Sequence, residues 1–132
     1  MTQRNIDVMD IIVSKMAEGD KLSRALERVY DKRSVCIPHN DEDFNVSVTD
    51  IGLSSRAIRI LIRTKLMTVG AVVDFCNMNN ITDIVNMGKN TGIEVFESIL
   101  DYCWEHMDQK ERIAFLIDTV ERNSDNIREG IA

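Results

Sequence analysis

Apolar residues recur three or four positions apart along most of the chain, a spacing that predicts amphipathic α-helices. In the first segment this stripe consists of Ile6, Met9, Ile12, Val13 and Met16. It predicts a helix over about residues 3–18, with Gly19 placed to end it and Asp20 to cap the next helix. A second stripe continues that next helix to about Lys32. Two helices joined by a tight turn form an αα-hairpin, which must pack on the rest of the chain or on a second copy of itself.

The helical pattern fails over residues 34–48, where Pro38 and the acidic run 41–43 predict a loop or linker. The acidic run could bind a cation, but without a glycine-containing ligand loop it is better explained as a solvated linker. Val46 and Val48 alternate with polar neighbours, which predicts a short extended piece.

Four helical elements follow between residues 53 and 104. A serine caps the first, with Leu53 as a hydrophobic staple before it. Its predicted inward residues are Ala57, Ile58, Leu61 and Ile62. Thr68 is placed to cap a second, short helix over about residues 69–76.

The third of these elements is a short helix opened by Asn79 or Asn80. Its apolar residues are Ile81, Ile84 and Val85. The segment 86–88 breaks it, and Asn90 or Thr91 starts a longer helix. The apolar set of that fourth helix is Ile93, Val95, Phe96, Ile99, Leu100 and Cys103.

A last helix is predicted over about residues 108–122, and residues 123–132 are expected to fray. The sequence therefore predicts an all-α protein with a central module and helical additions at both ends. Its parts are a helical hairpin over residues 1–33, an acidic linker over 34–47, the central module over 48–107, and a C-terminal helix and tail over 108–132.

The net charge of −6 argues at first against a nucleic-acid partner, but the charge is unevenly distributed. Residues 51–93 hold five basic and two acidic residues, a net charge of +3. The segments before and after them carry net charges of −3 and −6. Residues 51–93 are therefore a positive region between acidic flanks.

Other signals are weak. No stretch approaches the roughly 18 continuous apolar residues of a membrane span, and residues 1–10 lack the features of a signal peptide. The isolated cysteines, without zinc-ligand spacing, are Cys36, Cys76 and Cys103. His39 and His106 have no partner at a catalytic spacing. We therefore expect a cytoplasmic protein that is not an enzyme and has no catalytic residue, metal site, cofactor or membrane partner.

Two features of the central module carry candidate chemistry. The first is a group of basic residues in a stretch without acids, namely Arg56, Arg59, Arg63 and Lys65. The second is the segment 84–91, which has the form of a helix-hairpin-helix turn. There Gly88 lets the backbone approach another chain, and the first amides of the next helix point outward beside Lys89, Asn90 and Thr91. Such amides, at the positive end of a helix dipole, suit a DNA phosphate.

Each feature alone has a plainer explanation, because a row of arginines is usually a solvated helix face and a Gly-Lys turn is usually a helix end followed by a new start. Together, inside one four-helix unit, they favour DNA binding. Arginines on the neighbouring helix would enter the minor groove, whose negative potential is deepest in narrow A·T-rich sequence. Phosphate contacts would set affinity and register.

Residues 51–61, Met67–Gly70 and 86–95 together resemble the C-terminal domain of the bacterial RNA polymerase alpha subunit. The resemblance covers about residues 48–106. It implies a compact helix-hairpin-helix fold that binds A/T-rich DNA through the minor groove and meets transcription factors. Arg56 matches the family's principal minor-groove arginine, and Arg59 stands where an asparagine that reaches DNA is usual.

In the turn, Gly88, Lys89 and Thr91 match the residues that grip the DNA backbone in that family, and Glu94 matches an acidic residue that follows. Asn90 replaces a second lysine, which removes one phosphate contact. Gly92 replaces a larger apolar residue and is expected to loosen the packing of the last helix. We also expect no large assembly domain like that of an alpha subunit, since the 47 residues before the module are too few to build it.

Three hypotheses follow. The leading one is a transcription-associated protein that binds A/T-rich DNA through the eight named residues of positions 56–91. The alternative is a module that binds RNA polymerase or a transcription factor without appreciable DNA affinity, which the acidic flanks favour. In the third, the N-terminal helices form a homodimer that presents two modules and multiplies a weak DNA affinity.

Overall fold

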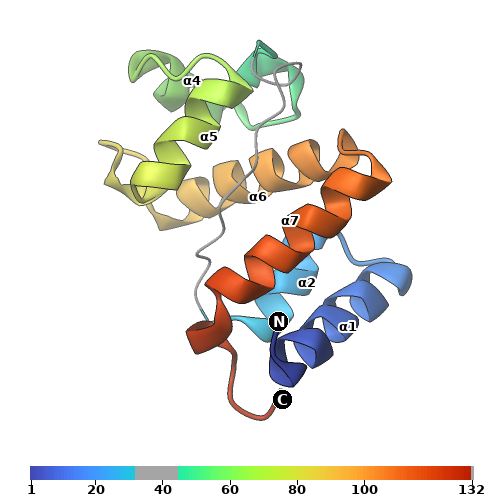
Figure 1. Ribbon diagram of the computed structural model, residues 1–132. Coiled ribbons are helices and arrows are strands. Elements are labelled where there is room, and N and C mark those ends of the chain that lie inside the picture. The colour runs from blue at the N-terminus through green and yellow to red at the C-terminus, as the bar shows by residue number, and fades with distance from the viewer. Residues whose placement is uncertain (32–44, 132) are drawn as a thin grey trace. The chain divides into compact units, whose positions relative to one another are not determined.

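The computed structural model describes residues 1–31 and 45–131 (Figure 1). These residues form α-helices joined by short turns, and their only paired extended backbone is two isolated antiparallel bridges, Tyr30 with Ile127 and Ser47 with Thr68. The predicted all-α class is confirmed for them, and no helix among them is long and apolar enough to cross a membrane. Four features of the sequence fall outside this part, namely Cys36, Pro38, His39 and the acidic run 41–43.

The described residues divide into two compact units. Unit 1 combines residues 1–31 with residues 107–131, and unit 2 is residues 45–106. The N-terminal hairpin and the C-terminal helix, which the sequence presents as separate additions, are therefore parts of one body. The physical reason is that neither can bury its apolar face alone.

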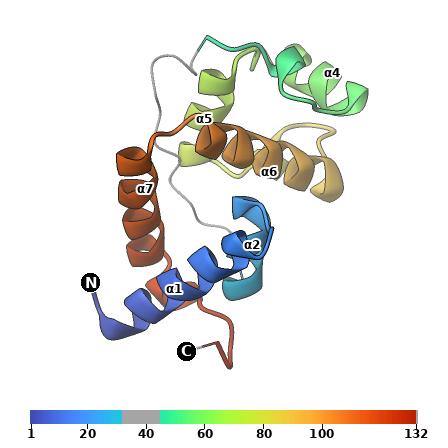
Figure 2. The same ribbon diagram turned by 90° about the vertical axis from the view of Figure 1, so that its right-hand side faces the viewer.

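Unit 1 contains α1 (Gln3–Ala17), α2 (Leu22–Val29) and α7 (Gln109–Arg122), followed by a single 3-10 turn, η3 (Ser124–Asn126). Helix α1 packs against both α2 and α7 (Figures 1 and 2). The side chains that fill the interior are Val8, Ile12, Leu22, Leu26, Val29, Phe115, Leu116 and Val120.

The buried face of α1 differs from the predicted one. Ile12 of the expected stripe is buried, together with Asn5 and Val8, whereas Ile6 and Val13 of that stripe are exposed. Asn5 is accommodated because its amide nitrogen donates to the Ser124 hydroxyl at 2.9 Å. The buried face therefore lies beside the most apolar stripe instead of along it.

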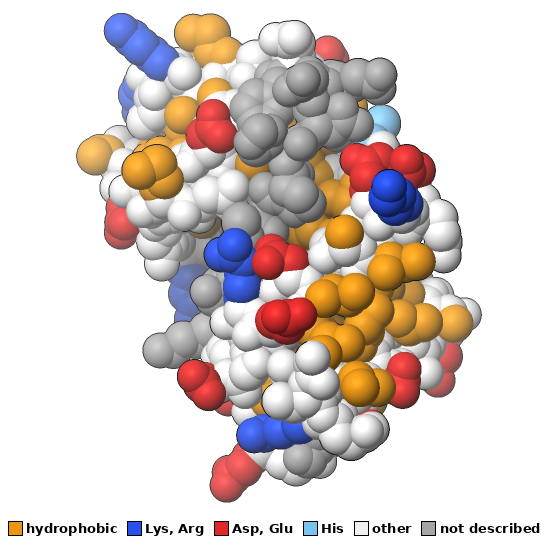
Figure 3. All heavy atoms as spheres, viewed as in Figure 1, with side chains coloured by type: hydrophobic (Ala, Val, Ile, Leu, Met, Phe, Trp, Pro, Cys, Tyr) orange, Lys and Arg blue, Asp and Glu red, His pale blue; other side chains and the backbone are white. Residues whose placement is uncertain are grey.

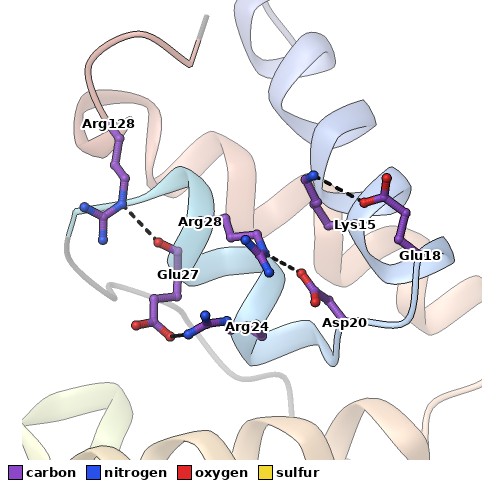
Figure 4. A network of polar contacts seen from close by, with 7 residues as sticks. All are labelled: Lys15, Glu18, Asp20, Arg24, Glu27, Arg28 and Arg128. Carbon is purple, nitrogen blue, oxygen red and sulfur yellow. Dashed lines mark hydrogen bonds and ion pairs between the residues drawn. The ribbon is translucent and has the colours of Figure 1, made fainter.

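The turn after α1 also corrects one expectation. Gly19 ends the helix region with φ of 116°, as a glycine can. Asp20, however, does not cap α2, whose N-cap is Lys21 without a side-chain hydrogen bond. The Asp20 carboxylate instead accepts from Arg28 Nε (Figure 4). This hydrogen bond lowers the pKa of Asp20 and raises that of Arg28.

The predicted fraying of the tail is wrong for residues 123–131. The Asn126 carbonyl accepts from Asp31 N at 3.0 Å, and Arg128 N donates to the Val29 carbonyl at 2.9 Å. Arg128 Nε also donates to the Glu27 carbonyl at 3.0 Å (Figure 4). The tail is held because it satisfies carbonyls at the C-terminal end of α2.

Unit 2 begins with η1 (Val48–Asp50) and continues with α4 (Ser55–Arg63), α5 (Val69–Met78), η2 (Ile81–Asp83) and α6 (Lys89–Glu105). In both ribbon views α4 and α5 lie on one side of α6, and both contact it (Figures 1 and 2). The predicted extended piece is present, since Val48 N donates to the Met67 carbonyl and Val69 N to the Val46 carbonyl.

The predicted caps of unit 2 are confirmed at two helices. The Ser54 hydroxyl accepts from Ala57 N at 3.2 Å and the Thr68 hydroxyl from Ala71 N at 3.1 Å. The third element is only a single 3-10 turn, η2, with Asn80 as its cap. Three residues of the apolar sets predicted for this unit, Ile62, Val85 and Ile93, are exposed instead.

Candidate nucleic-acid interface

An open groove of about 260 Å³ lies beside α4. Its lining residues are Arg56, Arg59, Ile60, Arg63 and Asn86. Three of the predicted basic residues thus face one space, since positions i, i+3 and i+7 share a helix face. The neighbouring face of α4, with Ala57 and Leu61, is buried, and this burial fixes the direction in which the arginines point.

The three guanidinium groups lie close together without neutralising partners. Among residues 1–31 and 45–131, Arg56, Arg59 and Arg63 make no ion pair, and all three are exposed. The nearest fixed acceptor is the Asn86 carbonyl, which receives a long hydrogen bond from Arg56 Nη2 at 3.4 Å. Because guanidinium presents several donors, the groove is rich in unused hydrogen-bond donors and positive charge.

Asn86 connects this groove to the start of α6. It has φ of 67°, a left-handed conformation that asparagine tolerates better than most residues. Gly88, two positions later, has φ of 69° and serves as the N-cap of α6. The sequence marks residues 86–88 as a helix break, but it did not identify Asn86 as a lining residue of the groove.

The first turn of α6 has unoccupied amides. Its N-cap is a glycine, so no side chain caps the helix, and no acidic residue stands in the first turn. The N–H groups of Lys89, Asn90 and Thr91 therefore lack an intrahelical acceptor. The side chains of Lys89 and Asn90 are exposed and that of Thr91 is half-buried. An anion placed here would meet three amides and the positive end of a long helix.

A polar clamp holds α4 and α6 in register. Both carboxylate oxygens of Glu94 are used, since one accepts from Ser54 N and the other from the Ser54 hydroxyl, each at 2.8 Å. The clamp joins the N-terminal end of α4, which carries the arginines, to the second turn of α6. The acidic residue at position 94 is therefore explained by a structural contact within unit 2.

Of the four basic residues predicted between positions 56 and 65, Lys65 does not line the groove. It follows α4 with φ of 62°, and the next amide, Leu66 N, donates to the Leu61 carbonyl at 2.9 Å. This geometry ends the helix as a left-handed C′ residue does. Lys65 is exposed and contributes positive charge near the groove's helix without forming part of the groove.

Gly92 corrects another expectation, because the packing around it is close. A Cβ atom at this buried position would lie 2.9 Å from Thr82 Cγ2 and 3.4 Å from Ile81 Cγ2. The turn η2 thus rests directly on the first turns of α6. Glycine at position 92 permits this approach, which supports the loop that leads to Asn86 and Gly88.

The described residues contain no group of three or more histidine, cysteine or acidic side chains that could hold a metal ion. Burial raises the pKa of the Cys76 thiol to about 11, so it is protonated at neutral pH. Comparisons of the chain with family models, curated proteins and solved structures find no match.

Proposed function

We propose that residues 45–106 are a helix-hairpin-helix module that binds duplex DNA in a transcription-related role. The arginines that line the groove beside α4, which we call the arginine groove, would enter the minor groove of A/T-rich DNA. The amides of the first turn of α6 would bind a backbone phosphate. The observation that carries this proposal is the set of three unpaired guanidinium groups lining one groove with Asn86, two residues before the uncapped start of α6.

Shape and charge support duplex DNA over a small anion. A small anion would need one or two donors in an enclosed pocket, whereas this groove is open and its charges extend along two turns of α4. The row of positive groups thus matches a row of phosphates along an extended polyanion. The A/T preference follows from the same arginines, because a narrow minor groove attracts guanidinium groups.

The test is the binding of labelled 20-base-pair duplexes, one A/T-rich and one G/C-rich, measured by fluorescence anisotropy at several salt concentrations. We expect weak binding with a preference for the A/T-rich duplex. The variant Arg56→Ala with Lys89→Ala should weaken it at least tenfold and reduce the slope of log affinity against log salt by about two.

The matched control is Arg24→Ala with Lys21→Ala, which removes the same charge from exposed positions of unit 1. It should leave both the affinity and the salt slope close to those of the native chain. Equal binding by the native chain and the Arg56, Lys89 variant would overturn the proposal, as would an equal loss in the control.

A second candidate is recognition of RNA polymerase or a transcription factor. It is favoured by Val85, whose side chain is 76% exposed directly beside Asn86 of the groove. An apolar side chain offers no hydrogen bond or charge to a phosphate, whereas it can pack against an apolar side chain of another protein. Binding of purified polymerase that is lost in Val85→Ser, and kept in Arg56→Ala with Lys89→Ala, would favour this candidate.

A further inference from the structure

Unit 1 carries an apolar surface that its own core does not cover. Figure 3 shows hydrophobic side chains gathered over α1 and the adjacent part of α7. The exposed members are Ile6 and Val13 on α1 and Ile113 on α7, with exposed fractions of 38%, 46% and 45%. Because α1 and α7 contact each other, these side chains belong to one surface of one unit. We call them the α1–α7 surface.

Each half of the α1–α7 surface contains a charged residue close to its apolar members, Asp10 on α1 and Lys110 on α7, and these two charges are opposite. Asp10 lies on the same helical face as Ile6 and Val13, at i+4 and i−3. On α7, Lys110 lies on the same face as Ile113 and Ile117, at i−3 and i−7. The acid is thus on the α1 half and the base on the α7 half.

These two charged side chains have no partner among the described residues of unit 1. In the part of the chain that the structure describes, neither Asp10 nor Lys110 makes an ion pair or a side-chain hydrogen bond. Other charges of the same helices are paired, as in Lys15 with Glu18 at 3.2 Å. Asp10 and Lys110 thus lie beside the exposed apolar positions and are available to a charged partner.

We propose that the α1–α7 surface binds a second copy of this chain. Under a two-fold axis, α1 of one chain packs on α7 of its partner, and the Asp10–Lys110 pair forms twice. The surface is complementary to itself in this arrangement, because the Asp10 carboxylate of each chain meets the Lys110 ammonium of the other. This interface involves none of the groove residues, and it holds whether or not the proposed DNA function is correct.

Charge reversal gives a sharp test, because the pair can be restored in reversed order. Sedimentation velocity of the full chain over a range of concentrations should show a monomer of 15.1 kDa in equilibrium with a dimer of about twice that mass. Asp10→Lys and Lys110→Glu should each raise the dimer dissociation constant about tenfold, since each places two like-charged pairs in the interface. Asp10→Lys combined with Lys110→Glu should return it to within about threefold of the native value.

Two controls distinguish a loss of dimerisation from a loss of folding. Circular dichroism should show the same helix content in all variants, since lysine and glutamate are good helix formers and a glutamate near the N-terminus of α7 is favourable. Lys21→Glu, an exposed reversal elsewhere in unit 1, should leave the dissociation constant unchanged.

Three results would overturn the proposal. One is a native chain that stays monomeric up to about 1 mM, the weakest association that could be called specific. Another is a dimer that neither reversal weakens. The last is a double variant that dimerises as poorly as the single ones, which would mean that Asp10 and Lys110 do not meet.

Discussion

At Gly92 two opposing effects of a single methyl group can be compared. Alanine in place of a helical glycine gains about 0.5–1 kcal/mol from backbone propensity. At this position the new Cβ would lie 2.9 Å from Thr82 Cγ2, and overpacking of a buried site costs about 1–3 kcal/mol. We expect Gly92→Ala to lower the free energy of unfolding by about 1 kcal/mol, measured by urea denaturation.

The control for this substitution removes the clashing methyl group. Thr82→Ser keeps the hydroxyl that donates to Asn80 Oδ1 at 2.8 Å and deletes Cγ2. In that background Gly92→Ala should be neutral or stabilising, because only the propensity gain is left. The same loss in both backgrounds would show that Thr82 is not the obstacle.

Tyr30 places a hydroxyl in the interior of unit 1 without a hydrogen-bond partner among the described residues. Burial raises its pKa to about 12, against about 10 in the unfolded chain. An unsatisfied buried hydroxyl is costly, so Tyr30→Phe should be neutral at pH 7 or stabilising by about 1 kcal/mol. Urea denaturation at pH 7 would contradict this if the variant were clearly less stable.

The same residue predicts a pH dependence. Below pH 10 Tyr30 is protonated in both states and contributes no slope. Between about pH 10 and 12 the unfolded chain releases this proton and the folded chain keeps it, so stability falls as pH rises, by about 1–2 kcal/mol in total. Tyr30→Phe should not show this part of the loss of stability. The part that comes from deprotonation of the Cys76 thiol, whose pKa is about 11, should be the same in the native protein and in the variant.

At the scale of elements, the apolar residues of α1 are spread over two adjacent faces, and the structure buries the face that holds Asn5, Val8 and Ile12. The reason lies at its N-terminal end, where the buried Asn5 hydrogen-bonds Ser124 after α7. A partner 119 residues away in the sequence thus satisfies the buried Asn5 amide, which allows this face of the helix to be buried. The exposed stripe is then left for the α1–α7 surface.

Two matched valine substitutions test this rotation. Val8 is fully buried, so Val8→Ala should cost about 2 kcal/mol of unfolding free energy. Val13 is 46% exposed, so Val13→Ala should change the stability of the monomer by less than about 0.5 kcal/mol. Thermal denaturation of dilute protein, where dimers are scarce, would measure both. A larger cost at Val13 than at Val8 would mean that the sequence-based stripe is the buried one.

At the scale of the whole molecule, residues far apart in sequence close unit 1. Arg128 N donates to the Val29 carbonyl, and its side chain donates to the Glu27 carbonyl and pairs with Asp31 at 3.2 Å. The positive charge also lies favourably at the C-terminal end of α2. The two ends of the chain are in this way one folding unit, while unit 2 is formed by residues between them.

Arg128→Ala should therefore lower the stability of unit 1 by about 1–2 kcal/mol. Hydrogen exchange read by mass spectrometry should quicken in residues 1–31 and 107–131 and stay unchanged in residues 45–106. Arg24→Ala, which breaks an exposed pair with Glu27 on the same helix, is the matched control and should have little effect. Equal quickening in both units would show that they do not unfold separately.

The sequence by itself determined the features that depend on neighbouring residues. Ser54 and Thr68 cap their helices, and the Asp108 carboxylate accepts from Glu111 N at the start of α7, because the acceptor and its amide are three residues apart. The row of arginines on α4 follows from helix periodicity for the same reason.

Only tertiary structure decided what depends on distant partners. It set the buried face of α1, the need for glycine at position 92, the attachment of the tail to α2 and the presence of Asn86 in the arginine groove. Each of these is a contact between segments that no local spacing specifies, and each was selected by the burial and hydrogen bonding of the whole unit.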